Sequence, residues 1–466
     1  MSETVKPNPL GVEPVGKLIL KFAVPSTIAL IINALYNIVD QIFIGNIVGY
    51  LGNAATNIIF PLTVFSIAIP SLLGEGCAAY FSLQLGKGNR EKGSRGICNT
   101  LLLITVISIS ILTLCELFMT QLCKLFGASS ETLPYAASYG RIIVIVFPFV
   151  SLAVAMSAIS RADGSPRYAM VGMLAGTIIN IVLDPIFIRI GYNSAGISGG
   201  VACAAFATIL GQIINGVWFA PYFRRFKNAG LKKEYFLLKW KIIRKIAALG
   251  ISGFILQICV VLTTTIINNM MTKHGANSVY GADIPMAAMG ITLKISSIVI
   301  YLVQGIATGA QPIIGFNYGA GKYDRTKKTF KIAVIVSTII MFICMVIIQV
   351  FPMAIISLFG DESELYNEFA IKSLRTYLLL CPMYGLQLTS GYFLQSVGKP
   401  VLSSLNTITR QFITIIPTVL ILSSVIGVNG PLWAGVVADA LSFIVTIMIL
   451  ATCWKRIFPK EVKVNA

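Results

Sequence analysis

Apolar runs of membrane-spanning length follow one another along almost the whole chain, and they limit its possible folds more than any other feature. About 20 apolar residues in a helix cross the hydrocarbon core of a bilayer. The 466 residues are 56% hydrophobic and only 12% charged, whereas soluble domains carry roughly 25% charged residues. Because so few charges cannot cover a water-soluble globule, we predict an all-α integral membrane protein.

The apolar runs predict about twelve transmembrane helices. Polar breaks separate the apolar runs, and the positions of these breaks give the expected boundaries of the spans. The predicted spans are residues 17–45, 54–83, 97–121, 136–160, 168–190, 197–221, 241–272, 284–316, 330–358, 373–396, 401–426 and 431–456.

Basic residues alternate between the predicted loops. The loop Asn46–Asn53 has none, whereas nine basic residues from Arg224 to Lys245 follow the sixth span. By the positive-inside rule, both termini face the cytoplasm. The polar, proline-rich N-terminus has no apolar core of the signal-peptide type, so we expect the first span to be permanent.

The remaining composition excludes several classes of function. The net charge is +18, but the charges lie in short loop blocks, so we expect no nucleic-acid partner. Nine scattered cysteines and a single histidine, His274, argue against a zinc site. No Gly-x-x-x-x-Gly-Lys-Ser/Thr motif is present, so ATP is not the direct energy source. We expect that the protein needs no cofactor and that an ion gradient is its source of energy.

The chain repeats itself at an offset of 231 to 234 residues. Leu125-Phe126-Gly127 recurs as Leu358-Phe359-Gly360, and Gly196-Ile197-Ser198-Gly199 resembles Gly427-Val428-Asn429-Gly430. The repeat predicts two pseudo-symmetric six-helix bundles: an N-terminal lobe at 1–221, a basic cytoplasmic linker at 222–240 and a C-terminal lobe at 241–466. Parallel repeats of this kind are typical of transporters, with the substrate between the lobes.

Two carboxylates deep in the first lobe are the strongest candidates for function. Asp40 and Asp184 each lie six or seven residues before the outer end of a span that runs outward, so we expect them at similar depth. Asn180 shares a helix face with Asp184, and Thr208 approaches the same height. Such an oxygen cluster suits Na⁺, and a carboxyl pair that shares one proton suits H⁺. The alternative is that the acids only fix helix packing through hydrogen bonds.

The second lobe lacks this acid. Pro185 aligns with Pro417, which places Asp184 opposite Ile416. We therefore assign the coupling chemistry to the first lobe. Pro25 and Pro185 each remove a helical hydrogen bond, and each is either a static kink or a hinge that bends when Asp40 changes charge.

Several stretches resemble the multidrug and toxic compound extrusion (MATE) transporters of the prokaryotic DinF-like branch, along nearly the whole chain. They include Ala23-Val24-Pro25, the run from Tyr36 to Asp40, and Asn180-x-x-x-Asp184-Pro185. The resemblance implies two six-helix bundles in a prokaryotic cell membrane, and export of drugs in exchange for Na⁺ or H⁺. It also implies that the coupling cation binds at Asp40, Asn180, Asp184 and Thr208.

A substrate cavity is expected to include Tyr36, Glu75, Lys294 and Asp439, with cationic, amphipathic compounds as substrates. Glu75 is otherwise a paired carboxylate, and Asp439 otherwise a partner of Lys294 or Arg410. We expect the protein to interact with small-molecule substrates and the lipid bilayer, to need no obligatory protein partner and to be a monomer. A flippase for lipid-linked sugars is the alternative, but it predicts a basic cavity. A membrane enzyme would need a nucleophile–base pair or a metal site within the membrane, and it is disfavoured because the sequence has a single loop histidine and no metal cluster.

Overall fold

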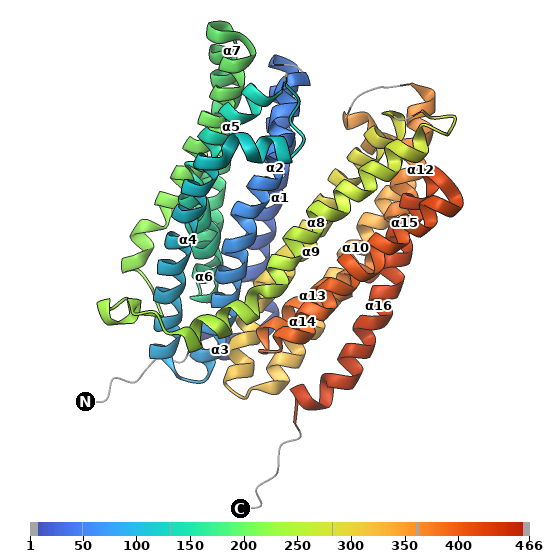
Figure 1. The fold of residues 1–466 in the computed structure, drawn as a ribbon. Coiled ribbons are helices and arrows are strands. Elements are labelled where there is room, and N and C mark those ends of the chain that lie inside the picture. The colour runs from blue at the N-terminus through green and yellow to red at the C-terminus, as the bar shows by residue number, and fades with distance from the viewer. Residues whose placement is uncertain (1–7, 49, 131, 282, 360–362, 460–466) are drawn as a thin grey trace, which may run out of the picture. The chain divides into compact units, whose positions relative to one another are not determined.

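The structure is a computed structural model that describes residues 8–48, 50–130, 132–281, 283–359 and 363–459. Every regular element in these ranges is a helix, and the helices are shown in Figure 1. The longer ones are α1 (Val15–Ile47), α2 (Tyr50–Pro70), α3 (Gly76–Gly86), α4 (Arg90–Leu125), α5 (Leu133–Val144), α6 (Phe147–Ala162), α7 (Pro166–Trp218), α8 (Trp240–Gly275), α9 (Asp283–Gly319), α10 (Tyr323–Val350), α12 (Glu364–Tyr377), α13 (Cys381–Ser396), α14 (Pro400–Ile408), α15 (Ile415–Ile426) and α16 (Gly430–Ile457).

Short helical segments connect or interrupt these helices. Two of them are π-helices that continue the membrane helices around them, and the others are short turns at helix ends. They are η1 (Pro9–Gly11), η2 (π, Ser71–Glu75), η3 (Ala220–Arg224), η4 (Lys233–Phe236), α11 (Pro352–Ile356), η5 (Ser357–Phe359), η6 (π, Thr409–Thr414) and η7 (Gly427–Asn429).

The helices confirm the predicted membrane-spanning fold. Among the described residues, eight helical stretches are long and apolar enough to cross a bilayer, and the bent pair α5–α6 makes up to nine. Two stretches, Pro166–Arg224 with 59 residues and Pro400–Ile457 with 58, are each long enough to cross twice, because a crossing takes about 20 residues. With α12–α13, which is more polar, these elements account for the twelve predicted spans.

Glycines with positive φ recur at the repeat positions. The break in α7 falls at Gly196, with φ 60°, and the turn after α15 falls at Gly427, with φ 62°. Gly164 and Gly398 likewise have φ of 89° and 76°. Residues with a Cβ rarely adopt this conformation. The turns therefore repeat in backbone conformation as well as in sequence.

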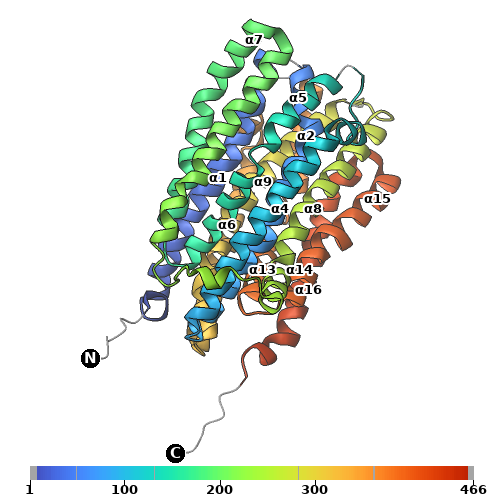
Figure 2. The same cartoon turned by 60° about the vertical axis from the view of Figure 1, so that its left-hand side comes forward.

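The chain divides into two compact units. One is Val24–Ile258, and the other comprises the described residues of Met1–Ala23 and Cys259–Ala466. In the first, α4, α6 and both halves of α7 run side by side (Figures 1 and 2), around a core that includes Ile59, Met119 and Phe147. In the second, α9, α10, α13 and α16 surround a core that includes Val303 and Phe369.

Large apolar side chains remain exposed along single helix faces. On α10 they recur at intervals of one to four residues along the helix, as expected for a face covered by lipid. They are Ile335, Ile339, Phe342, Ile343, Val346, Ile347 and Val350.

Candidate functional site

The first unit contains a cluster of buried polar side chains, centred on α7. Asn180 is 2% exposed and Asp184 is fully buried. The Asn180 Nδ2 donates to Asp184 Oδ1 at 3.0 Å and lies 3.4 Å from the Thr208 Oγ1. The two halves of α7, separated by the break at Gly196, thus meet at this cluster.

Close helix contact brings these groups together. A Cβ on Gly176 would lie 2.5 Å from the Gly211 carbonyl oxygen, and a Cβ on Gly211 would lie 2.6 Å from that of Gly176. Neither position leaves room for a side chain, so the two halves approach closely, as small residues permit in membrane helices. Asn180 follows Gly176 by one turn and Thr208 precedes Gly211 by one turn, which sets the two side chains opposite each other.

α1 supplies the other side of the cluster. The Asp40 side chain interacts with that of Asp184, and the Tyr36 hydroxyl interacts with Thr208. A hydrogen bond between two carboxyl groups requires a proton on one of them, and without it the like charges repel. The pair therefore needs a shared proton or a bound cation.

Several oxygen atoms of the cluster lack a partner. Asp40 Oδ1, Asn180 Oδ1 and Asp184 Oδ2 are buried and accept no hydrogen bond from the described residues. Buried polar atoms are normally paired. Carboxylate and amide oxygens are also the ligands that hard cations prefer, so the chemistry of the cluster fits a proton or a small alkali cation.

The sequence prediction missed Tyr139 on α5. Its side chain is 7% exposed, and it interacts electrostatically with Asp40, Tyr36 and Asp184. Nothing in its apolar surroundings distinguishes it from a packing residue. It completes the wall of the cluster from a third helix.

Glu75 lies apart from this cluster, in the π-helix η2. Its Oε2 is buried without a hydrogen-bond partner among the described residues, and the positive charge of Arg161 acts on its carboxyl group. A Cβ on Gly253 would lie 2.8 Å from this oxygen, so Glu75 packs against α8. π-helical turns occur frequently at functional sites.

In the second unit the buried acid is already paired. Arg410 Nε donates to Asp439 Oδ1 at 2.8 Å, and the two side chains are 6% and 2% exposed. The guanidinium also lies 3.8 Å from the centre of the Tyr384 ring. This is one of the two pairings that the sequence left open for Asp439. Lys294, the other basic candidate, is half-buried on α9.

The repeat gives this pair its significance. Thr208 lies 12 residues after Gly196, and Asp439 lies 12 residues after Gly427, so the two occupy equivalent positions. The cluster of the first unit has buried oxygens without a hydrogen-bond partner in the described part of the chain. In the second unit the guanidinium of Arg410 occupies the corresponding role, as a cation that belongs to the protein itself. The acid of this unit is neutralised without a mobile cation.

Both candidate hinge prolines lie inside continuous helices. α1 continues through Pro25, which follows directly after the boundary between the two units at Ala23 and Val24. Pro185 follows Asp184 in α7, whose only residues outside the helical conformation are Ala195 and Gly196. A hinge role for either proline remains a prediction.

Fold and site together define a helical transport protein with a buried acidic centre in one of two repeated units. The MatE family profile matches residues 25–186 and 253–420, and the chain belongs to this family of multidrug efflux transporters. It is a transporter and not an enzyme, and transporters of this family need no prosthetic cofactor.

Relatives and solved structures agree with this assignment. The multidrug export protein MepA of Staphylococcus haemolyticus is 27% identical over 449 residues, which cover 95% of this chain and 94% of MepA. The MATE multidrug transporter DinF-BH, solved as a complex, is 30% identical with a TM-score of 0.86, covering 98% of this chain and 99% of its own. A MATE transporter in complex with MaL6 has a TM-score of 0.89 at 21% identity, covering 97% and 99%.

Proposed function

We propose that this protein is a secondary active exporter that exchanges organic, cationic and amphipathic compounds for Na⁺ or H⁺ by alternating access. The observation that carries the proposal is the buried cluster of Asp40, Asn180, Asp184 and Thr208, with its unpaired oxygens. A cation that enters this cluster neutralises the repulsion between the two acids. Loading and release therefore change the charge on α1 and α7, the two helices that carry Pro25 and Pro185.

The second unit supports a single coupling site. Arg410 permanently neutralises Asp439, whereas the first unit has no basic group in its cluster among the described residues. We assign the exchangeable cation to the first unit alone, in the N-terminal lobe at 1–221. The lobe at 241–466 is its counterpart, in which the buried acid is neutralised by Arg410.

The proposed substrate class rests on the acidic character of the buried cluster in the first unit and on the relatives. MepA is named a multidrug export protein, and DinF-BH is named a multidrug transporter. We propose that Tyr36, Glu75 and Lys294 border the substrate path. Asp439 was the fourth candidate for this path, but it is 2% exposed and paired with Arg410. A flippase for lipid-linked sugars is less well supported, because it would need basic groups to bind pyrophosphate, and the buried cluster of the first unit is acidic.

We place the protein in the plasma membrane as a monomer, with both termini in the cytoplasm. Multiple spans and bacterial relatives support the membrane, and the basic even-numbered loops support the orientation.

Dye efflux from proteoliposomes tests the proposal. A sodium gradient and a proton gradient are imposed separately on wild type, Asp40→Asn and Asp184→Asn, with Glu116→Gln on α4 as a control that removes an acid outside the cluster. One gradient is expected to drive efflux in wild type and the control, and in neither cluster variant. Efflux that survives both cluster substitutions would exclude this coupling site.

A further inference from the structure

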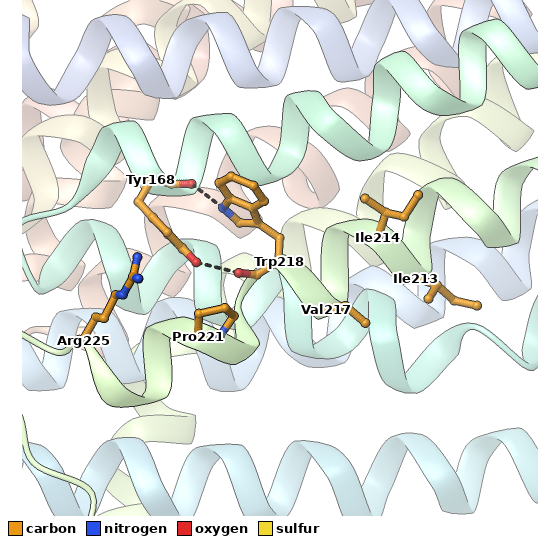
Figure 3. Close-up of a pocket in the computed structure, with 7 residues that line it drawn as sticks. All are labelled: Tyr168, Ile213, Ile214, Val217, Trp218, Pro221 and Arg225. Atoms are coloured by element: carbon orange, nitrogen blue, oxygen red, sulfur yellow. Dashed lines mark hydrogen bonds between the residues drawn. The ribbon is translucent and has the colours of Figure 1, made fainter.

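A pocket of about 500 Å³ lies on the first unit, and no residue of the acidic cluster lines it. Figure 3 shows this pocket. It is formed where the second half of α7 ends and η3 begins. Its lining is Tyr168, Ile213, Ile214, Val217, Trp218, Pro221 and Arg225. Apart from the guanidinium of Arg225, the side chains that line it present mainly hydrocarbon and aromatic surface.

The aromatic wall of this pocket is held rigidly. The Tyr168 hydroxyl donates to the Trp218 carbonyl oxygen at 2.6 Å, and Trp218 Nε1 donates to the Tyr168 carbonyl oxygen at 3.2 Å. A Cβ on Gly172 would lie 2.5 Å from the Trp218 ring, so this ring rests directly on the α7 backbone. The pocket is therefore largely formed before any ligand binds.

The two ends of the pocket differ in chemistry. Figure 3 shows Arg225 at one end and Ile213 and Ile214 at the other, with Tyr168 and Trp218 between them. Indole and phenol side chains prefer the boundary between hydrocarbon and headgroups. The aliphatic end thus lies at the depth of acyl chains, and the guanidinium lies at the depth of phosphates.

Arg225 has no counter-ion of its own among the described residues. Asp163, an acid of the same region, is buried and accepts hydrogen bonds from the Tyr222 hydroxyl and from the backbone of Lys227 and Asn228, each at 2.8 Å. The Lys227 ammonium donates to the Gly164 carbonyl oxygen at 3.1 Å. The Arg225 guanidinium is therefore available to an external anion.

We propose that this pocket binds one anionic phospholipid of the adjacent leaflet. Its phosphate pairs with Arg225, and an acyl chain lies against Val217, Ile213 and Ile214. Basic pockets beside membrane helices on the cytoplasmic side recognise such headgroups, and a guanidinium binds phosphate in a bidentate manner.

Native mass spectrometry of the purified full chain tests this proposal. Phosphatidylglycerol and phosphatidylcholine are added separately to wild type, Arg225→Gln and Arg224→Gln. Arg224 is the matched control, because it is an exposed neighbour with the same charge that does not line the pocket. We expect Arg225→Gln to lose about tenfold of the preference for phosphatidylglycerol, and Arg224→Gln to keep it. Equal loss in both variants would mean attraction to a general basic surface, and would overturn the proposal.

A second measurement tests the acyl chain. Phosphatidylglycerol is expected to raise the thermal unfolding midpoint of wild type in detergent, whereas phosphatidylcholine and water-soluble glycerol phosphate do not. Val217→Trp, which fills the pocket, is expected to abolish this rise. Stabilisation by glycerol phosphate alone, or a rise that persists in Val217→Trp, would show that no acyl chain occupies the pocket.

Discussion

Asn180 is the residue that joins the two halves of the acidic cluster, since its amide contacts both Asp184 and Thr208. Its own Oδ1 is buried and unpaired, which leaves it free to bind a cation. Asn180→Ala should raise the cation concentration for half-maximal transport by about tenfold, because a hydrogen bond to a charged group contributes about 1.5–3 kcal/mol. Thr208→Ser keeps the hydroxyl and should behave as wild type. The same half-saturating concentration in Asn180→Ala and wild type would remove Asn180 from the site.

Arg410 is expected to matter for stability rather than for ion exchange. Arg410→Met leaves the Asp439 carboxylate buried and unpaired, which costs about 3–5 kcal/mol of unfolding free energy. The double variant Arg410→Met with Asp439→Leu removes both charges and should recover most of the loss. Thermal unfolding in detergent measures both. Equal destabilisation in the single and double variants would show that the ion pair is not the cause.

The sequence predicted some of these residues and not others, for physical reasons. Asp40 and Asp184 were found because charge within a span is costly, and helical spacing put Asn180 beside them. Tyr139 was missed because a tyrosine within a predicted span looks like any packing residue. For Asp439 the sequence left open a place in the cavity or a pairing with Lys294 or Arg410. The choice of Arg410 depends on the packing of neighbouring helices, which a separation of 29 residues along the chain does not encode.

The acidic cluster depends on close contact between the two halves of α7. Gly176 and Gly211 allow the two halves of α7 to touch, so Gly211→Ala must push them apart or displace Asn180, whose Cβ lies 3.0 Å from the new methyl position. We expect destabilisation of about 1–3 kcal/mol and loss of coupled transport. Gly290→Ala on α9 is the matched control, since its added Cβ meets nothing within 4 Å. Normal transport by Gly211→Ala would show that this contact does not position the site.

The predicted linker at 222–240 is attached to the first unit by side chains far away in sequence. Asn99 Nδ2 donates to the carbonyl oxygens of Tyr235 and Leu237, and its Oδ1 accepts from the Lys239 backbone. Span lengths and charge patterns predicted where the linker lies, but not these contacts. Side chains that bond to a backbone about 140 residues away leave no periodic signal.

Asn99→Ala should therefore loosen the linker. Loss of these buried hydrogen bonds, each contributing about 0.5–1.5 kcal/mol, should make trypsin cleavage after Lys232 and Lys233 about tenfold faster. Asn89→Ala is the control, because Asn89 is exposed and its side chain makes only a 3.5 Å contact with Gln84. Unchanged cleavage in Asn99→Ala would mean that other contacts, such as Arg95 on the Tyr235 ring, hold the linker alone.

At the scale of the whole molecule, the same backbone turns recur in both repeats while the buried charges differ. Gly196 and Gly427 keep matching dihedral angles, yet Thr208 in one half corresponds to Asp439 in the other. Repetition preserves these turns, and divergence of a few polar positions separates the proposed exchangeable site of the first unit from the ion-paired acid of the second. The proposed transport cycle requires this difference, because a cation bound equally in both halves would give them no distinct roles.

The orientation of the chain decides which side of the membrane receives the substrate. The chain has nine cysteines, of which six are buried, so labelling needs a parent variant in which the native cysteines are replaced by residues of similar size, such as Ala or Ser. Ser129→Cys, between α4 and α5, should react with a membrane-impermeant maleimide in intact cells. Asn89→Cys, beside the basic residues that begin α4, should react only after permeabilisation, because basic loops stay in the cytoplasm. The opposite pattern would place both termini outside and reverse the direction of transport that we propose.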